Sequence, residues 1–238
     1  MTSSLSSINI VSWFFTLISW AIIIFLGMMQ YRKQKEKPAW WKIAIVVIIG
    51  IFSFSWKTQL FGVSVKIAIL PLGVWLIAMS TQKHAWEKYR PFAWVGFWCN
   101  YVFLFLTLVS AGIHSLIYPV DKPETFLADL DHVVLVSLHP SAPKAVLDND
   151  YLQKMVGQLH SADKTVVDWY NRSVLESSPQ YKTEQFPYEL TSVHSRWGSG
   201  LQAVVYIEKD GKGLLISTVD NQYYYRSEKE LMKIGDVS

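Results

Sequence analysis

The sequence predicts a membrane α-helical bundle of four transmembrane helices, followed by an extracytoplasmic α+β domain. Three observations lead to this fold class: four apolar runs precede residue 120, the second half is polar, and the two halves carry opposite charge. Residues 1–120 contain ten Lys or Arg and two Asp or Glu, whereas the remainder contains twelve and seventeen. The boundary therefore separates a membrane domain, residues 1–119, from a polar domain, residues 120–238.

The four apolar runs are the predicted transmembrane spans, at about residues 8–30, 41–57, 60–79 and 92–115. A hydrocarbon core of about 30 Å requires roughly 20 helical residues. The first run meets this length without a charged side chain, and the fourth is similarly long. The second is short, and the third contains Lys66 and Pro71. Residues 41–79 therefore form either two spans or one re-entrant hairpin.

Small and weakly polar side chains occur within the spans. Ser12, Thr16 and Ser19 share one helical face of the first span, and Asn100 lies within the fourth. Such residues let transmembrane helices approach closely and form hydrogen bonds with one another. They are expected to pack within the bundle or, alternatively, against a partner subunit.

Basic residues predict the orientation, because cytoplasmic loops are enriched in Lys and Arg. The first loop contains Arg32, Lys33, Lys35, Lys37 and Lys42, and the third contains Lys83, Lys88 and Arg90. Both loops are expected in the cytoplasm, which places the N-terminus and the polar domain outside. A re-entrant hairpin at residues 41–79 would leave this topology unchanged. The predicted location is the plasma membrane of a bacterial envelope, with the lipid bilayer and not nucleic acid as a partner.

The polar half is expected to form one compact domain of about 115 residues. Alternating apolar residues and turn signals such as Asp210-Gly211 predict an antiparallel meander, and a 3.6-residue apolar period predicts a helix. The expected strands are 131–139, 188–196, 201–208, 213–219 and 222–226, and the expected helices are 149–175, in one or two pieces, and 227–234. Ser227 and Glu230 form the capping box of the last helix. Clustered strands indicate an α+β domain.

Few motifs point to chemistry. The chain has no nucleotide-binding, HExxH or nucleophile-elbow motif, and no carboxylate lies within a span, which argues against a coupled transporter. Cys99, the one cysteine, lies in a span, so the polar domain forms no internal disulfide. The histidines lack the spacing of metal ligands, and neither a metal nor a cofactor is expected.

Aromatic residues are the candidate binding site of the polar domain: Trp197, Tyr206, Tyr223, Tyr224 and Tyr225. Aromatic rings combine apolar area with a polar group and are frequent in binding surfaces. The alternative interpretation is that these tyrosines pack across strands.

Two functional hypotheses follow. The first is a non-enzymatic regulatory, sensory or assembly protein whose outward-facing domain binds a ligand or an envelope protein. The alternative is a hydrolase-like envelope enzyme. It would combine a histidine with an aspartate from the set His132, His139, His194, Asp129, Asp131 and Asp220. General acid–base catalysis requires such side chains within hydrogen-bonding distance, so the enzyme hypothesis requires that they converge in one cleft.

Overall fold

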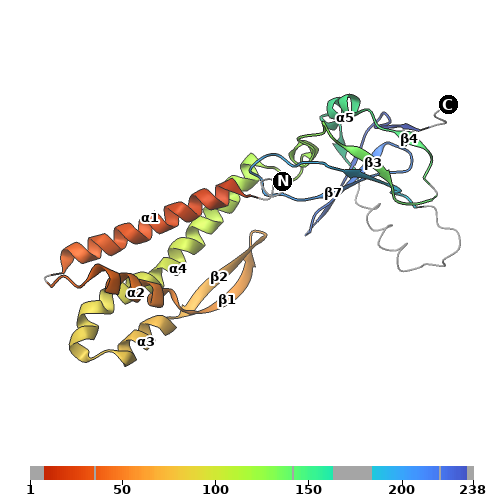
Figure 1. The fold of residues 1–238 in the computed structure, drawn as a ribbon. Coiled ribbons are helices and arrows are strands. Elements are labelled where there is room, and N and C mark those ends of the chain that lie inside the picture. The colour runs from red at the N-terminus through yellow and green to blue at the C-terminus, as the bar shows by residue number, and fades with distance from the viewer. Residues whose placement is uncertain (1–7, 35, 141, 163–183, 220, 235–238) are drawn as a thin grey trace, which may run out of the picture. The chain divides into compact units, whose positions relative to one another are not determined.

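The computed structural model describes residues 8–34, 36–140, 142–162, 184–219 and 221–234. The chain divides into two compact units (Figure 1). One unit, here called the helical unit, comprises residues 11–116. The other, here called the polar unit, comprises residues 117–238 together with the residues up to Ile10. Each unit is described separately.

The helical unit contains two long helices and a compact insertion between them. Its elements are α1 (Ile10–Lys33), α2 (Trp40–Ile51), β1 (Phe54–Leu60), β2 (Val63–Leu70), α3 (Leu72–Ser80) and α4 (Lys83–Ile117). α1 and α4, of 24 and 35 residues, are long and apolar enough to cross a membrane. They run side by side in opposite directions (Figure 1), and the rings of Trp20 and Phe103 meet with centroids 5.5 Å apart.

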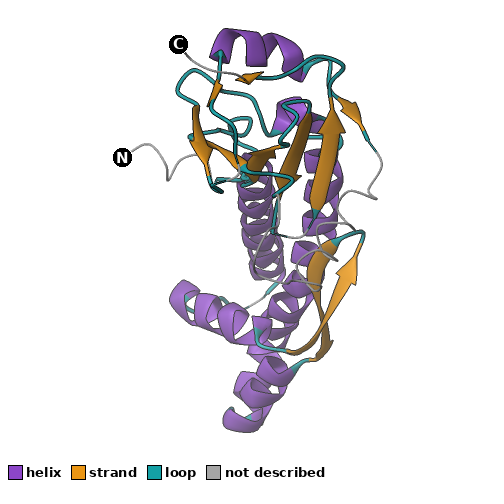
Figure 2. Ribbon diagram, turned by 90° about the vertical axis from the view of Figure 1, so that its right-hand side faces the viewer, coloured by secondary structure: helices purple, strands orange, loops and turns teal. Residues whose placement is uncertain are grey.

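The insertion differs from the expected spans at residues 41–57 and 60–79. α2 ends at Ile51, and β1 and β2 form an antiparallel hairpin (Figure 2). In this hairpin Trp56 lies opposite Ile67. Phe61 and Gly62 have φ values of 52° and 76°, as a two-residue hairpin turn of type I′ requires. The described residues therefore contain two helices of membrane-spanning length where four were expected. The physical reason is the alternation of β-branched and polar residues along β2, which suits a strand.

Glycines bring α2, α3 and α4 into contact. A Cβ atom on Gly96 of α4 would lie 2.2 Å from the carbonyl oxygen of Val47, and one on Gly73 would lie 1.7 Å from that of Ile49. Asn100 also joins these helices, because its side-chain amide donates to the carbonyl of Ile51 at 3.1 Å. Close backbone approach through small residues is typical of helix packing in membranes.

The small-residue face expected on the first span contributes less to helix packing than the glycines do. The hydroxyl groups of Thr16 and Ser19 donate to carbonyls four residues earlier in α1. Ser19 is buried, whereas Ser12 and Thr16 are exposed. Of Ser12, Thr16 and Ser19, it is therefore Ser19 that packs within the helical unit.

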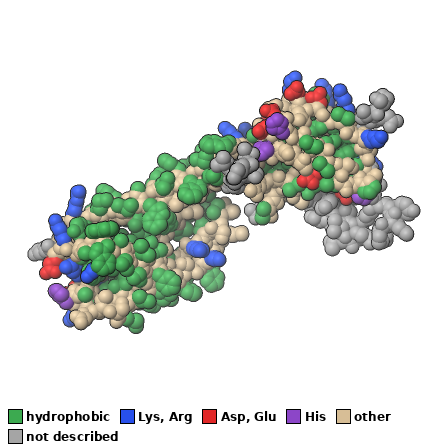
Figure 3. Space-filling model, viewed as in Figure 1, with side chains coloured by type: hydrophobic (Ala, Val, Ile, Leu, Met, Phe, Trp, Pro, Cys, Tyr) green, Lys and Arg blue, Asp and Glu red, His purple; other side chains and the backbone are tan. Residues whose placement is uncertain are grey.

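The two basic loops meet at one end of the helical unit. The amide of Gln34 donates to the carbonyl of Lys88 at 2.7 Å, and the Lys88 ammonium lies 3.3 Å from Glu36. Figure 3 shows Lys and Arg side chains gathered at this end, while hydrophobic side chains cover the visible face of the helices. The end of α1 and the start of α4 thus lie on the same side of the unit.

The polar unit is built on an antiparallel sheet. Its elements are a 3₁₀ turn (Pro123–Thr125), β3 (Val134–Ser137), β4 (Ala145–Val146), α5 (Asn149–Val156), β5 (His160–Ser161), β6 (Tyr188–Thr191), β7 (Val204–Ile207), β8 (Gly213–Ser217), β9 (Gln222–Arg226) and β10 (Lys233–Ile234). The six-stranded sheet has the order β3-β6-β7-β8-β9-β5. The succession β6 to β9 confirms the expected antiparallel meander and the α+β class.

One face of this sheet forms the core. Its buried side chains include Ile207, Leu214 and Ile216, which belong to the same cluster as Leu152 and Met155 of α5. Asp148 caps α5, because its carboxylate accepts a hydrogen bond from the backbone of Tyr151 at 3.1 Å. The amphipathic period of α5 thus places its apolar residues on the sheet.

Two expected helices are corrected. The helix expected at 149–175 ends at Val156, and His160–Ser161 pairs with β9 as a strand. The part of that expectation from residue 163 onward lies outside the described residues. The helix expected at 227–234 is wrong, because Lys233–Ile234 pairs with β4 and the Ser227 hydroxyl accepts from the backbone of Lys229. Burial of Leu231 and Met232 in the core overrides the local capping signal.

Candidate functional site

The sheet has a second face, which we call the Tyr206 face. Cross-strand register places Glu189 of β6 opposite Tyr206, Tyr206 opposite Leu215, and Leu215 opposite Tyr224. Directly paired residues point to the same side of a sheet. The row continues onto β3, where Val136 lies opposite Glu189. Five strands therefore contribute one row of side chains to this face.

A groove lies on the Tyr206 face. It has a volume of about 400 Å³ and is lined by Leu138, His139, Glu184, Phe186, Tyr206, Leu215, Ser217 and Gln222. The buried side chains of Phe186, Leu215 and Tyr224 pack together beneath it, and Phe186 meets Tyr224 edge to face at 6.1 Å. An apolar, aromatic floor with a few polar groups at the rim is the usual composition of a binding groove.

β3 forms an edge of the sheet beside this groove. Within the described residues no strand pairs with its other side, so part of its backbone remains available for pairing. Val134, Val136 and Leu138, at alternating positions, are 56%, 37% and 50% exposed. An exposed edge that carries apolar side chains is a template for addition of another strand.

A charged network stabilises the neighbouring part of the Tyr206 face. Glu208 accepts hydrogen bonds from the Tyr224 hydroxyl at 2.6 Å, the Arg226 guanidinium at 2.7 Å and the Gln185 amide at 2.8 Å. Arg226 also bonds to Asp210. Burial raises the pKa of Tyr224 to about 12, and its bond to Glu208 acts in the same direction. The five residues of this network bond to one another, which indicates a structural role.

The predicted aromatic residues divide between three places. Tyr206 lies in the groove, and Tyr224 lies under it with its hydroxyl bound to Glu208. Tyr223 and Tyr225 point to the core face, where Tyr223 packs on Phe126 at 5.8 Å. Trp197 lies in a loop and is 74% exposed. Successive residues of a strand alternate in direction, so three consecutive tyrosines cannot share one face.

The groove contains residues that the sequence reasoning missed. Phe186 and Leu215 form its floor, and Glu184 lies at its rim. His139, also at the rim, was named from the sequence as a candidate catalytic residue and not as part of a binding groove. The available signal was alternation: Leu215 is the middle residue of β8, and Tyr224 is the middle residue of β9. Phe186 lies before β6 and not within a strand, so alternation gave no signal for it.

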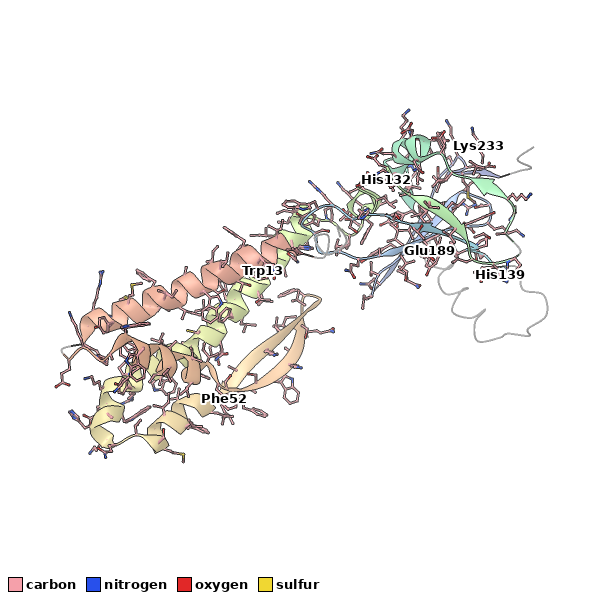
Figure 4. All side chains as sticks on the ribbon, in the orientation of Figure 1. Trp13, Phe52, His132, His139, Glu189 and Lys233 are labelled. Carbon is pink, nitrogen blue, oxygen red and sulfur yellow. The ribbon has the colours of Figure 1, made fainter. Side chains whose placement is uncertain are left out.

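The histidines proposed for catalysis are separated. His132 and His139 lie two residues before and two residues after β3, and Figure 4 shows them apart. Asp129 and His194 are joined through their backbones in an isolated bridge. Asp220 lies outside the described residues. His139 is therefore the member of the proposed set that lines the groove, and it lies there with Glu184.

Within the part of the chain that the structure describes, no group of three His, Cys, Asp or Glu side chains is arranged to hold a metal ion. No family model, curated protein or solved structure matches the chain. The Tyr206 face and the adjoining edge of β3 are accordingly the basis for a functional assignment.

Proposed function

We propose that this chain is a multi-pass membrane protein of a bacterial envelope whose polar unit binds an extended segment of a protein partner outside the cytoplasm. Its role would be regulatory, sensory or in assembly rather than enzymatic. The observation that carries this proposal is the combination of an aromatic groove with an exposed apolar edge strand on the same face of one sheet.

Exposure of the two long helices supports the membrane assignment. In their most apolar windows, 17% of α1 and 28% of α4 is buried within the chain. Large side chains such as Trp13, Phe14 and Phe25 are more than half exposed. Apolar area left in water costs about 25 cal/mol per Å², whereas lipid covers it without that cost. A core helix of a soluble protein would instead be mostly buried.

The insertion between α1 and α4 fits the re-entrant alternative. α2 and α3, of 12 and 9 residues, reach about 18 and 14 Å at about 1.5 Å per residue. Neither length matches the roughly 30 Å hydrocarbon core. Under this proposal α1 and α4 span the membrane, and residues 40–80 enter and leave from the side of the basic loops.

The basic loops support an orientation. Gln34 and Glu36 each bond to Lys88, so the two Lys- and Arg-rich loops share one side. The positive-inside rule assigns that side to the cytoplasm. The beginning of α1 and the end of α4 then lie at the opposite surface, and the polar unit follows α4 there.

Partner binding follows from the chemistry of the Tyr206 face. An extended peptide added beside β3 would bond to its free backbone groups, and alternate side chains of that peptide would meet Val134, Val136 and Leu138. One apolar side chain of the partner could enter the groove over Phe186 and Leu215. Backbone pairing supplies affinity, and the groove supplies selectivity.

Photo-crosslinking in intact cells tests this proposal. A benzophenone amino acid at Tyr206 should form one discrete adduct, and Val136→Asp in the same chain should remove it. Tyr151, 36% exposed on α5, is the matched control position and should form no such adduct. Absence of an adduct from position 206, or the same adduct from position 151, would contradict the assignment.

A further inference from the structure

The loop Arg196–Gly200 of the polar unit is bonded to the first residue of α1 and to the last residue of α4. The backbone N–H of Ile10, the first residue of α1, donates to the carbonyl of Gly198 at 3.0 Å. The Arg196 guanidinium donates to the carbonyl of Ile117, the last residue of α4, at 3.1 Å. Ile10 and Ile117 both belong to the polar unit. The loop therefore lies where the two candidate membrane helices begin and end.

Glycine makes this close approach possible. Gly198 and Gly200 have φ values of +78° and +66°, which favour glycine. A Cβ atom on Gly198 would lie 2.8 Å from the Ile10 side chain, and one on Gly200 would lie 3.0 Å from Asn9. The loop is consequently packed directly on the residues that open α1.

Tyr118 fixes the backbone of Trp197. Its hydroxyl donates to the Trp197 carbonyl at 3.0 Å, and the Arg196 guanidinium lies over its ring at 5.6 Å. Although its backbone is held in this way, the Trp197 side chain is 74% exposed. Leaving a large aromatic side chain in water while fixing its backbone suggests a surface that covers it.

We propose that Trp197 anchors the polar unit to the lipid surface, with its indole at the boundary between headgroups and acyl chains. Tryptophan is enriched at this depth because its ring is apolar and its N–H is polar. The segment 196–201 carries one positive charge and no carboxylate, which suits a phospholipid surface. Val120, 40% exposed, lines a surface hollow together with Gly200 and extends the apolar contact.

This inference rests on the proposed membrane embedding of α1 and α4, and the test separates the two. In a Cys99→Ser background, an environment-sensitive fluorophore is attached to single cysteines at Trp197, Val120, Leu17 and Val146 in the full chain. Each protein is reconstituted into vesicles of phosphatidylglycerol and phosphatidylethanolamine that contain lipids with a quencher on the acyl chain. Leu17 lies within α1, and Val146, 49% exposed in β4, is the control on the polar unit.

The expected result is strong quenching by lipid-borne quencher at positions 197 and 17, weaker quenching at 120, and none at 146. If position 17 is quenched while positions 197 and 120 behave like 146, the anchor is disproved and the membrane embedding stands. If position 17 is not quenched, the embedding itself fails. Position 120 keeps the test valid should the Trp197→Cys protein fail to fold.

Discussion

At the scale of single residues, Glu208 shows how the polar unit tolerates a buried charge. Its carboxylate accepts from Tyr224, Arg226 and Gln185, and its side chain leaves no room beside Gly213, where a Cβ would lie 1.9 Å from Oε2. Removing one partner of a buried charged network leaves the others uncompensated. The network therefore stabilises the domain as a unit.

We expect Tyr224→Phe to destabilise the polar unit. The substitution keeps the ring against Phe186 but removes the hydroxyl bond to Glu208, and bonds to charged groups contribute about 1.5–3 kcal/mol. Urea unfolding of the detergent-solubilised protein, followed by near-ultraviolet circular dichroism, measures the change. Tyr151→Phe is the control, expected within about 0.5 kcal/mol of the parent. Equal effects of the two substitutions would contradict a structural role for the network.

Alkaline pH should weaken the same domain. Burial raises the pKa values of Tyr224 and Tyr225 to about 12, from 10.0 in the unfolded chain. Between pH 10 and 12 the unfolded chain releases protons that the folded domain retains, so the free energy of unfolding falls as pH rises. Unfolding midpoints measured from pH 9 to 12 should decline less in Tyr225→Phe than in the parent.

At the scale of elements, helix packing in the helical unit depends on missing side chains. The Cα of Gly50 lies 2.9 Å from the position that a Cβ on Gly96 would occupy. Interiors of proteins are close-packed, so an added methyl group must push α4 away from α2. Packing therefore favours glycine at position 96, although glycine has a low helix propensity.

Gly96→Ala should therefore destabilise the helical unit by about 1–3 kcal/mol, the usual cost of overpacking. Gly112→Ala is a matched control on the same helix, because nothing lies within 4 Å of a Cβ at that position. The control should be neutral or stabilise by up to about 1 kcal/mol. Thermal unfolding of both variants in detergent gives the comparison, and the prediction is lost if Gly96→Ala unfolds at or above the temperature of the control.

Sequence patterns predicted elements well where local and tertiary preferences agree. The strands of the meander, including residues 222–226, were predicted because alternation and turn residues point the same way. The hairpin formed by residues 54–70 was not predicted, since its apolar content resembles that of a membrane span. The prediction of a final helix at residues 227–234 was wrong, because burial of Leu231 in the core outweighs the local capping box. Local signals could not reveal the packing through Gly50, Gly73 and Gly96, which requires the partner helices.

Prediction of the site was limited for a related reason. Tyr206 was predicted as a binding residue because it is aromatic and lies in an expected strand. Its groove also needs Phe186 and His139, which come from segments distant in the sequence. The direction of Tyr223 and Tyr225 toward the core follows from register. Cross-strand register cannot be fixed from one strand alone, so the sequence showed aromatic content without its distribution over two faces.

At the scale of the whole molecule, the distribution of basic residues constrains the orientation of the chain in a membrane. The chain carries ten Lys or Arg in residues 1–120, and most of them occupy the two loops that bond through Lys88. Charged loops are costly to move across a bilayer, so this set of residues is a stronger constraint on orientation than the net charge of the polar unit.

The proposed orientation makes opposite predictions for positions 146 and 83, which it places on opposite sides of the membrane. In a Cys99→Ser background, a cysteine at Val146 should react with a membrane-impermeant maleimide in intact cells, because β4 exposes that position outside. A cysteine at Lys83, the first residue of α4, should react only after the membrane is permeabilised. Both positions lie outside the apolar windows, so accessibility reports the side of the membrane and not depth within it. Labelling of Lys83→Cys in intact cells together with protection of Val146→Cys would invert the topology, and binding of an envelope partner by the Tyr206 face would then be excluded.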